Sequence, residues 1–379
     1  MGSVLGANSI AIVTVVVWLY LLAGRGWFWR LREDAPLPLG RTNLSVAAVL
    51  PARDEAAVIG EALASLLAQA YPGSLHIFVV DDHSSDATAA IARKAAPADR
   101  LTVLTADSLP SGWTGKLWAL DCGLRLALAR KPDYLLFTDA DIVHAPRALE
   151  GLVARAEKNG LDLASLMVKL RCESAAERAL IPAFLYFFLK LYPPTWIEEL
   201  DSRTAGAAGG CILLRTSALR RIGGIEKIRG ELIDDCALAR EVKRGGPIWM
   251  GITSASRSIR AYDSFGEIGG MIARTAFTQL RHSTLLLVGT ILGLLITYVA
   301  PPVLAIAGPG TVAHVSGAVA WLIMMVTYWP TLRLYKRSPL WTLTLPLVAL
   351  FYAAATVRSA IAYWSGKGGL WKGRAQDQT

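Results

Sequence analysis

The chain carries an apolar run that ends on two aspartates, Leu135-Leu136-Phe137-Thr138-Asp139-Ala140-Asp141. The same arrangement occurs earlier in Ile77-Phe78-Val79-Val80-Asp81-Asp82, and a third acidic pair follows Leu232 and Ile233 as Asp234-Asp235. Short apolar runs are typical of buried strands, and side chains at strand ends converge on the crevice of an open α/β sheet. Several anions in one crevice repel each other unless a cation lies among them. Oxygen ligands favour a hard divalent ion, which in turn favours a phosphorylated substrate.

Strands and helices alternate around this motif. The predicted strands are Ser45–Leu50, Leu75–Val80, Leu101–Leu104 and Tyr134–Thr138. The predicted helices are Glu55–Ala70, a second one from Ser84 or Ser85 to Lys94, and a third one from Gly115 to about Ala129. This alternation predicts an α/β fold with a mainly parallel sheet and helices on both faces.

Four uncharged runs are long enough to predict membrane helices, because a spanning helix needs roughly 20 apolar residues. They are Val4–Ala23, Leu285–Ala307, Val312–Trp329 and Leu340–Val357. Arginines follow the first run, which indicates a retained anchor with its C-terminal side in the cytoplasm; a cleaved signal peptide is the alternative. The last run either spans the membrane or forms a re-entrant hairpin around Pro346.

The net charge of +9 lies largely beside these runs, which fits positive-inside topology and contact with anionic lipid. The central domain has no basic stripe interleaved with aromatics, so nucleic-acid binding is not expected. The four cysteines form no Cys-x-x-Cys pair, so neither zinc nor a disulfide framework is expected, and reduced thiols suit the cytoplasm. The basic residues beside the runs are Arg25, Arg30, Arg32, Arg333, Lys336, Arg337, Lys367, Lys372 and Arg374.

Each candidate site residue has a chemical and a structural interpretation. Asp139 and Asp141 suit Mg²⁺ or Mn²⁺ with sites left for a diphosphate, although Asp141 could instead cap a helix. Asp82 can accept from a base N–H or a ribose hydroxyl, or form an Asx turn with the serines that follow. Lys116 begins a helix after two glycines and is placed for phosphate contact, or is simply solvated.

Two further segments keep open alternatives. A carboxylate of Asp234-Asp235 can take a proton from an attacking hydroxyl, or the pair can be helix-start acids that the macrodipole favours. The aromatic stretch Leu180–Tyr192 is too short to span, so we expect either an interfacial helix or a buried core helix.

Taken together, five motifs resemble the family 2 glycosyltransferases. They are Val46–Glu55, Val79–Asp86, Asp139-Ala140-Asp141, Gly209–Arg215 and Asp234–Leu238, in the order that the family shows. The segment Gly112–Leu120, with one N-terminal and several C-terminal membrane runs, is similar to the bacterial hopene-associated glycosyltransferases and more distantly to ceramide glucosyltransferases.

The resemblance implies a GT-A fold, a nucleotide-sugar donor that is UDP-linked, and an inverting displacement. Carried over by position, Asp82 would bind the base, Asp139 and Asp141 the diphosphate and Mg²⁺ or Mn²⁺, and Asp235 would be the general base. The remaining positions are Pro51, Ala52, Glu55 and Lys116 on the donor side, and Asp234, Gly209, Gly210, Arg281 and His282 on the acceptor side.

Two departures from the family pattern are visible. Asp234-Asp235 stands where relatives often carry Glu-Asp. Polymer-forming relatives carry Gln-x-x-Arg-Trp near the membrane, and here Thr278 and His282 replace its glutamine and tryptophan while Arg281 fits the arginine. This difference argues against a polymer synthase.

The sequence therefore predicts a membrane-anchored enzyme that moves one sugar from a nucleotide diphosphate to a lipid hydroxyl, with a hopanoid as the candidate acceptor. The alternatives are a processive polysaccharide synthase and a non-catalytic membrane scaffold. We expect a multi-pass protein of the bacterial inner membrane with its catalytic domain in the cytoplasm and no nucleic-acid partner. The expected segments are an anchor (1–24), a linker (25–44), the catalytic domain (45–283), membrane helices (284–365) and a basic tail (366–379).

Overall fold

The computed structural model of the chain describes residues 2–31, 33, 37, 38, 40, 42–368, 370, 371, 374 and 375. Arg32, Lys372, the centre of the predicted linker and the end of the predicted tail lie outside these residues. The chain forms two compact units. The first comprises Met1–Leu31, Cys172–Thr195 and Ala261–Gly368, and the second comprises Arg32–Arg171, Trp196–Arg260 and Gly369–Thr379.

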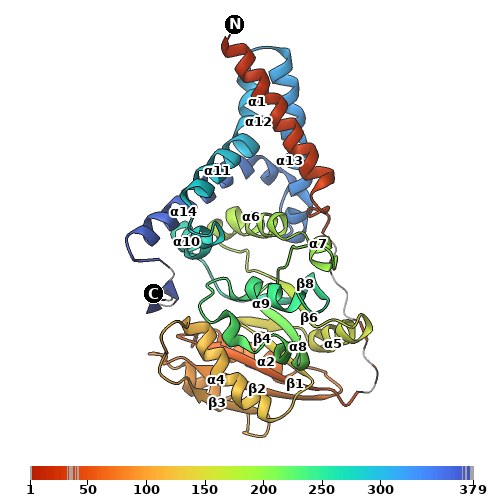
Figure 1. Cartoon of the computed structure of the whole chain (residues 1–379), viewed down its shortest axis with the longest axis vertical. Helices are drawn as coiled ribbons and strands as arrows, with labels where there is room; N and C mark the ends of the chain where they lie inside the picture. Colours follow the sequence, from red (N-terminus) through yellow and green to blue (C-terminus); the bar gives the residue numbers. More distant parts are fainter. Residues whose placement is uncertain are drawn as a thin grey trace. The chain divides into compact units, whose positions relative to one another are not determined.

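The second unit is built on an eight-stranded sheet with the strand order β3-β2-β1-β4-β7-β6-β8-β5 (Figure 1). Strands β3, β2, β1 and β4 are parallel, as are β6 and β8, whereas β7 runs antiparallel to both neighbours and β5 runs antiparallel to β8. The bounds are β1 Ser45–Ala52, β2 Ser74–Asp81, β3 Leu101–Thr105, β4 Tyr134–Thr138, β5 Ile142–His144, β6 Leu163–Lys169, β7 Cys211–Arg215 and β8 Ile248–Ser258. The prediction of a mainly parallel sheet is confirmed, and the four predicted strands are β1 to β4.

Helices pack on this sheet, and several of the predicted site residues lie at helix starts. Their bounds are α2 Ile59–Leu67, α3 Thr88–Lys94, α4 Gly115–Ala129, α5 Ala148–Lys158, α8 Thr216–Arg221, the 3₁₀ turn η2 Ile225–Ile228 and α9 Asp234–Lys243. The side chain of Thr114 caps α4 by accepting from Leu117 N, which sets the helix start just before Lys116. A Cβ on Gly123 would lie 2.6 Å from side-chain atoms of both Val49 and Val80, so glycine lets α4 lie directly on β1 and β2.

The first unit consists of helices. They are α1 Gly2–Leu19 with its π-helical continuation η1 Tyr20–Gly24, α6 Ala175–Leu191, α10 Phe265–Gln279, α11 Thr284–Leu294, η3 Leu295–Val299, α12 Ala300–Ala307, α13 Thr311–Leu334, η4 Pro339–Thr344 and α14 Leu345–Trp364. The short helix α7, Pro194–Glu198, begins where this unit passes into the second. Helices α1, α12 and α13 pack against one another (Figure 1).

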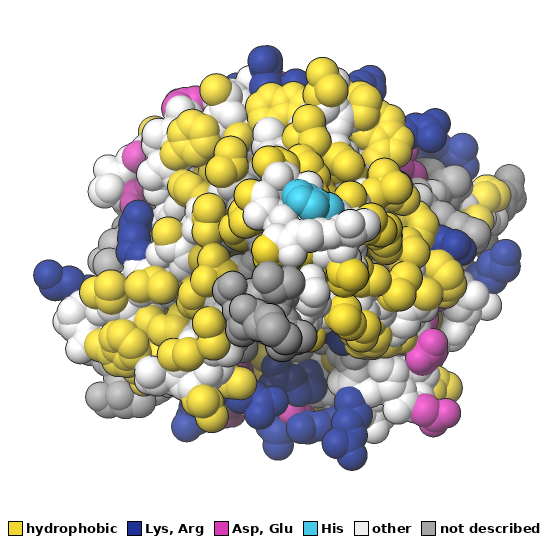
Figure 2. Space-filling model, turned by 90° about the horizontal axis from the view of Figure 1, so that it is seen from above, with side chains coloured by type: hydrophobic (Ala, Val, Ile, Leu, Met, Phe, Trp, Pro, Cys, Tyr) yellow, Lys and Arg dark blue, Asp and Glu magenta, His cyan; other side chains and the backbone are white. Residues whose placement is uncertain are grey.

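Within the described residues, four helical stretches are long and apolar enough to cross a membrane: Gly6–Gly24, Thr284–Ala307, Thr311–Leu334 and Pro339–Trp364. They coincide with the four predicted runs. Hydrophobic side chains dominate the face that Figure 2 shows, and many of the chain's exposed large hydrophobic side chains belong to these helices. The last stretch is continuous over 26 residues, with Pro346 in the first turn of α14, so no hairpin turn interrupts it.

The aromatic helix α6 is buried inside the first unit. Tyr186 packs against Phe28 and Tyr328, and Phe187 packs against Tyr298 and Tyr352. Tyr186 is fully buried, which favours a core helix of this unit over a helix that lies on its surface.

All four cysteines of the chain are buried, and none forms a disulfide. Burial raises the pKa of Cys211, in the middle of the sheet, to about 12, and it also raises the pKa of Cys122 in α4. The expectation of reduced thiols in a cytoplasmic domain stays a prediction.

Candidate functional site

An open pocket lies at the carboxyl ends of β1 and β4 in the second unit. Its walls come from the end of β1, the start of α4, the end of β4, the turn before β7, η2 and the start of α9. The lining residues are Pro51, Lys116, Leu117, Leu120, Phe137, Thr138, Asp139, Gly209, Ile212, Ile225, Ile228, Asp234, Asp235 and Leu238. The crevice expected at these strand ends is therefore present, with apolar walls and a few polar groups, as in most ligand sites.

Three carboxylates surround one ammonium group in this pocket. Lys116 Nζ lies 3.1 Å from Asp139 Oδ1 and 3.2 Å from Asp234 Oδ2, and Asp235 completes the group, which we call the pocket cluster. Burial by itself would lower the pKa of Lys116, but the three carboxylates outweigh burial and raise that pKa. Lys116 is therefore charged at neutral pH, and the interpretation of a merely solvated lysine is wrong.

Asp235 is held by backbone amides. Gly209 N donates to Asp235 Oδ2 at 2.9 Å, and Cys236 N donates to Asp235 Oδ1 at 2.7 Å. Burial and the nearby charge of Asp234 raise the pKa of Asp235 to about 6, although Lys116 and the two amides oppose the shift. A Cβ on Gly209 would lie 3.3 Å from Asp235 Oδ2, so the smallest residue lets the amide approach. A carboxyl with this pKa can accept a proton near neutral pH.

The other aspartate of the Asp-x-Asp pair faces a different environment. Asp141 is buried and does not line the pocket; Ser258 Oγ donates to Asp141 Oδ2 at 2.5 Å, and Arg260 Nε lies 3.5 Å from the same oxygen. Arg260 Nη2 also contacts Glu55 Oε1 at 2.5 Å. Asp141 therefore does not cap a helix. Ser258 ends β8 and Arg260 follows it; neither was among the predicted site residues, because no strand was predicted there.

A divalent ion is implied by the fold family, and the donor chemistry of the site fits one. Asp139 and Asp141 offer hard carboxylate oxygens, and a bound diphosphate can supply further ligands. Among the described residues, however, no group of three or more histidine, cysteine or acidic side chains is arranged to hold a metal ion without such help. Both carboxylates also already contact a cationic side chain, Lys116 or Arg260.

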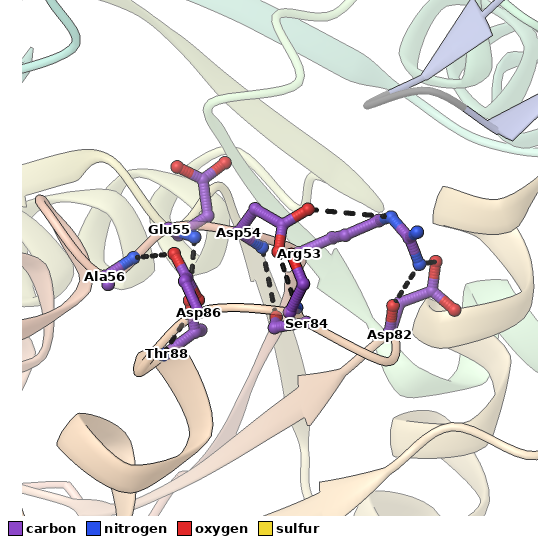
Figure 3. Close-up of polar contacts among 9 residues, drawn as sticks. Arg53, Asp54, Glu55, Ala56, Asp82, Ser84, Asp86 and Thr88 are labelled. Carbon is purple, nitrogen blue, oxygen red and sulfur yellow. Dashed lines mark hydrogen bonds and ion pairs between the residues drawn. The ribbon is translucent and has the colours of Figure 1, made fainter.

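The loops after β1 and β2 lie beside each other and are joined by acidic side chains (Figure 3). Asp54 Oδ1 accepts from Ser85 N at 2.7 Å, Asp86 Oδ2 accepts from Ala56 N at 3.0 Å, and Asp82 Oδ2 lies 3.6 Å from Arg53 Nη1. We call Arg53, Asp54, Asp82 and Asp86 the loop cluster.

This loop cluster bears on two predicted helix starts. Ser84 and Ser85 both contact Asp54, because Asp54 N donates to Ser84 Oγ and Ser85 N donates to Asp54 Oδ1. Neither serine caps a helix, because α3 begins only at Thr88 and its N-cap is Ala87. Asp54 has a positive φ of 51° and the amide of Glu55 donates to Thr88 Oγ1, so α2 begins at Ile59 and not at Glu55.

The structure places the remaining predicted site residues as follows. Pro51 lines the pocket and Ala52 ends β1, whereas Asp82 is fully buried beside Arg53. Arg281 and His282 belong to the first unit, at the turn between α10 and α11, where both have a positive φ. His282 stacks on Tyr363 with ring centroids 4.0 Å apart. The acceptor-side role of these two residues stays a prediction.

The fold is that of a GT-A-type α/β domain. A solved mannosyltransferase from Pyrobaculum calidifontis, in complex with GDP-Man and Mn²⁺, has the same fold, with a TM-score of 0.55 and 19% identity over 97% of this chain and 100% of that one. Residues 47–223 match the family model described as glycosyl transferase family 2. This stretch of the chain is therefore similar to the family 2 glycosyl transferases.

Curated relatives match over shorter stretches. The chain is 32% identical over 126 residues to a 4,4'-diaponeurosporenoate glycosyltransferase of Staphylococcus haemolyticus, a match that covers 32% of each chain. It is 35% identical over 116 residues to an uncharacterized protein of Methanocaldococcus jannaschii, covering 31% of this chain and 43% of that one. The chain thus spans about a third to under half of the length of these relatives.

Proposed function

We propose that the chain is a membrane-anchored inverting glycosyltransferase that moves one sugar from a nucleotide-diphosphate sugar, UDP-linked by resemblance, to a lipid hydroxyl. The observation that carries this proposal is the pocket cluster: a carboxyl with a pKa of about 6 beside a lysine that two other carboxylates hold. Such a pocket offers a proton acceptor next to groups that can bind a phosphorylated leaving group.

In this mechanism Asp235 removes the proton from the acceptor hydroxyl. The hydroxyl oxygen then forms a bond to the anomeric carbon, while the bond from that carbon to the diphosphate oxygen breaks on the opposite face. The amides of Gly209 and Cys236 keep the Asp235 carboxylate in place during proton transfer. Lys116, at the start of α4, would contact the diphosphate, as expected for a lysine at a helix start.

Asp139 and Asp141 would hold a Mg²⁺ or Mn²⁺ ion in this scheme. When bound, the ion stabilises the negative charge that builds up on the leaving diphosphate. Asp82, Pro51, Ala52 and Glu55 lie at or near the ends of β1 and β2, where a nucleotide would extend from the pocket.

A lipid acceptor is supported by the four helices that are long and apolar enough to span a membrane. The hopanoid class of acceptor rests on the resemblance alone, since the relative named above is printed with a different acceptor. The orientation with the catalytic domain in the cytoplasm follows from the arginines after the first helix. In intact cells, single cysteines at Pro309 and Asp107 should be labelled and protected, respectively, by an impermeant reagent; labelling at Asp107 would contradict the cytoplasmic placement.

The proposed activity is tested by donor hydrolysis across a panel of UDP-glucose, UDP-GlcNAc and GDP-mannose, with and without EDTA. We expect release of the nucleoside diphosphate from one donor, lost with EDTA and restored by Mg²⁺ or Mn²⁺. No release from any donor, in the presence of metal and membrane lipid, would favour the non-catalytic scaffold.

A further inference from the structure

The two aspartates of the Asp-x-Asp pair each contact a cationic side chain of the protein itself. Asp141 is only 7% exposed, and its Oδ2 atom receives both the Ser258 hydroxyl and Arg260 Nε. Asp139 is more open, with a side chain 36% exposed, and its Oδ1 atom contacts Lys116. A buried carboxylate is stable only when it is paired, and Arg260 and Ser258 are partners of Asp141 in this place.

Arg260 also binds a second acid. Its Nη2 atom contacts Glu55 Oε1 at 2.5 Å, and Glu55 is itself 8% exposed. In Figure 3 the carboxylate of Glu55 points away from Asp86 and Thr88, the neighbours that the rest of this loop contacts. The Arg260 guanidinium thus joins Glu55, in the loop after β1, to Asp141, which follows β4. A planar group with five N–H donors is suited to hold two carboxylates at once.

This arrangement has a consequence for any divalent ion that approaches the pair. An ion that binds both aspartates comes close to the Arg260 guanidinium, whose Nε atom lies 3.5 Å from Asp141 Oδ2. Two positive charges at one carboxylate repel each other strongly where burial weakens screening. A nucleotide diphosphate brings negative oxygens that can accept the guanidinium and the Lys116 ammonium as they leave the aspartates.

We infer that Arg260 is a resident counter-ion of Asp141, which a divalent ion displaces only when a nucleotide diphosphate is also bound. The inference rests on the proposed function, since it takes the metal-binding role of Asp139 and Asp141 from there. Arg260 is in these terms a positioning residue: it suppresses binding of the metal alone and couples metal binding to the donor.

The test measures Mn²⁺ binding to the purified full-length protein by the loss of the free-ion EPR signal, with and without UDP or GDP. The wild type should bind Mn²⁺ weakly alone and at least about tenfold more tightly with the nucleotide. Arg260→Gln should bind Mn²⁺ alone about tenfold more tightly than the wild type does. The matched control is Arg257→Gln, because Arg257 lies near the end of β8, three residues before Arg260, and pairs with Glu61 at the surface.

The double variant Glu55→Gln/Arg260→Gln repeats the test if Arg260→Gln does not fold, since it removes the guanidinium and its buried partner together. Equal Mn²⁺ affinity of the wild type and both Arg260 variants, without nucleotide, would overturn the inference. So would a wild type that binds Mn²⁺ equally well with and without nucleotide. Absence of Mn²⁺ binding in every variant would overturn the metal site as well, and donor hydrolysis without metal would then show whether the proposed transferase activity stands.

Discussion

The pocket cluster and the loop cluster are both acidic, and they lie at the ends of neighbouring strands, yet their carboxylates are satisfied in different ways. In the loop cluster, Asp54 and Asp86 accept from backbone amides and hydroxyl groups that join two loops. In the pocket cluster, three carboxylates share one lysine beside an open pocket. The first arrangement uses its charge internally, whereas the second leaves more negative than positive charge beside the pocket. Acidic residues at strand ends therefore divide into those that join loops and those that face the pocket.

The largest effect should come from Asp235→Asn. This change removes the proton acceptor, while the side-chain oxygen of asparagine can still accept a hydrogen bond from Gly209 N. We expect transfer to fall by about 10²–10⁴-fold, the usual contribution of a general base, with donor binding unchanged. Asp234→Asn is the matched control and should retain most activity. Transfer assays together with nucleotide titration measure both quantities, and a dead Asp234→Asn beside an active Asp235→Asn would reverse the assignment.

A second prediction concerns the pH dependence of transfer. The base must be unprotonated, and the pKa of Asp235 is raised to about 6 rather than near its ordinary 3.8. Activity should therefore fall as the pH drops through about 6. Because the charge of Asp234 raises this pKa, Asp234→Asn should move the acidic limb to lower pH. A rate profile with the same acidic limb in both proteins would contradict the role of Asp234 in setting the pKa.

The smallest effect should come from the loop cluster and should appear as stability rather than chemistry. Asp86→Ala removes the acceptor for Ala56 N and for the amide and hydroxyl of Thr88. We expect a loss of about 1–3 kcal/mol in the free energy of unfolding, with little change in the transfer rate of the folded protein. The control is Asp121→Ala, an exposed pair with Arg125 that should cost less than about 1 kcal/mol. A variant Asp86→Ala that is stable but inactive would show that the loop cluster takes part in the reaction.

The fold could be predicted from the sequence more fully than the contacts within the site. The strands β1, β2 and β4 and the four long apolar helices could be predicted, because their apolar runs are continuous and bounded by turns or charges. The pairing of Lys116 with Asp139 and Asp234 could be anticipated only as a meeting of strand and helix ends. The contacts of Arg260 with Glu55 and Asp141 could not, because they join residues far apart in the chain across β8 and the loop after β1. Likewise, the contacts of Ser84 and Ser85 with Asp54 depend on two loops that lie side by side, which local spacing does not encode.

The burial of the four thiols has a practical consequence for labelling work. A cysteine reacts as its thiolate, and burial both raises the pKa of Cys211 to about 12 and keeps reagents away from it. Cys122, Cys172 and Cys236 are likewise enclosed. The native cysteines should therefore react little with maleimide probes in the folded protein. A single cysteine introduced at a surface position can then report on topology without replacement of the four buried cysteines.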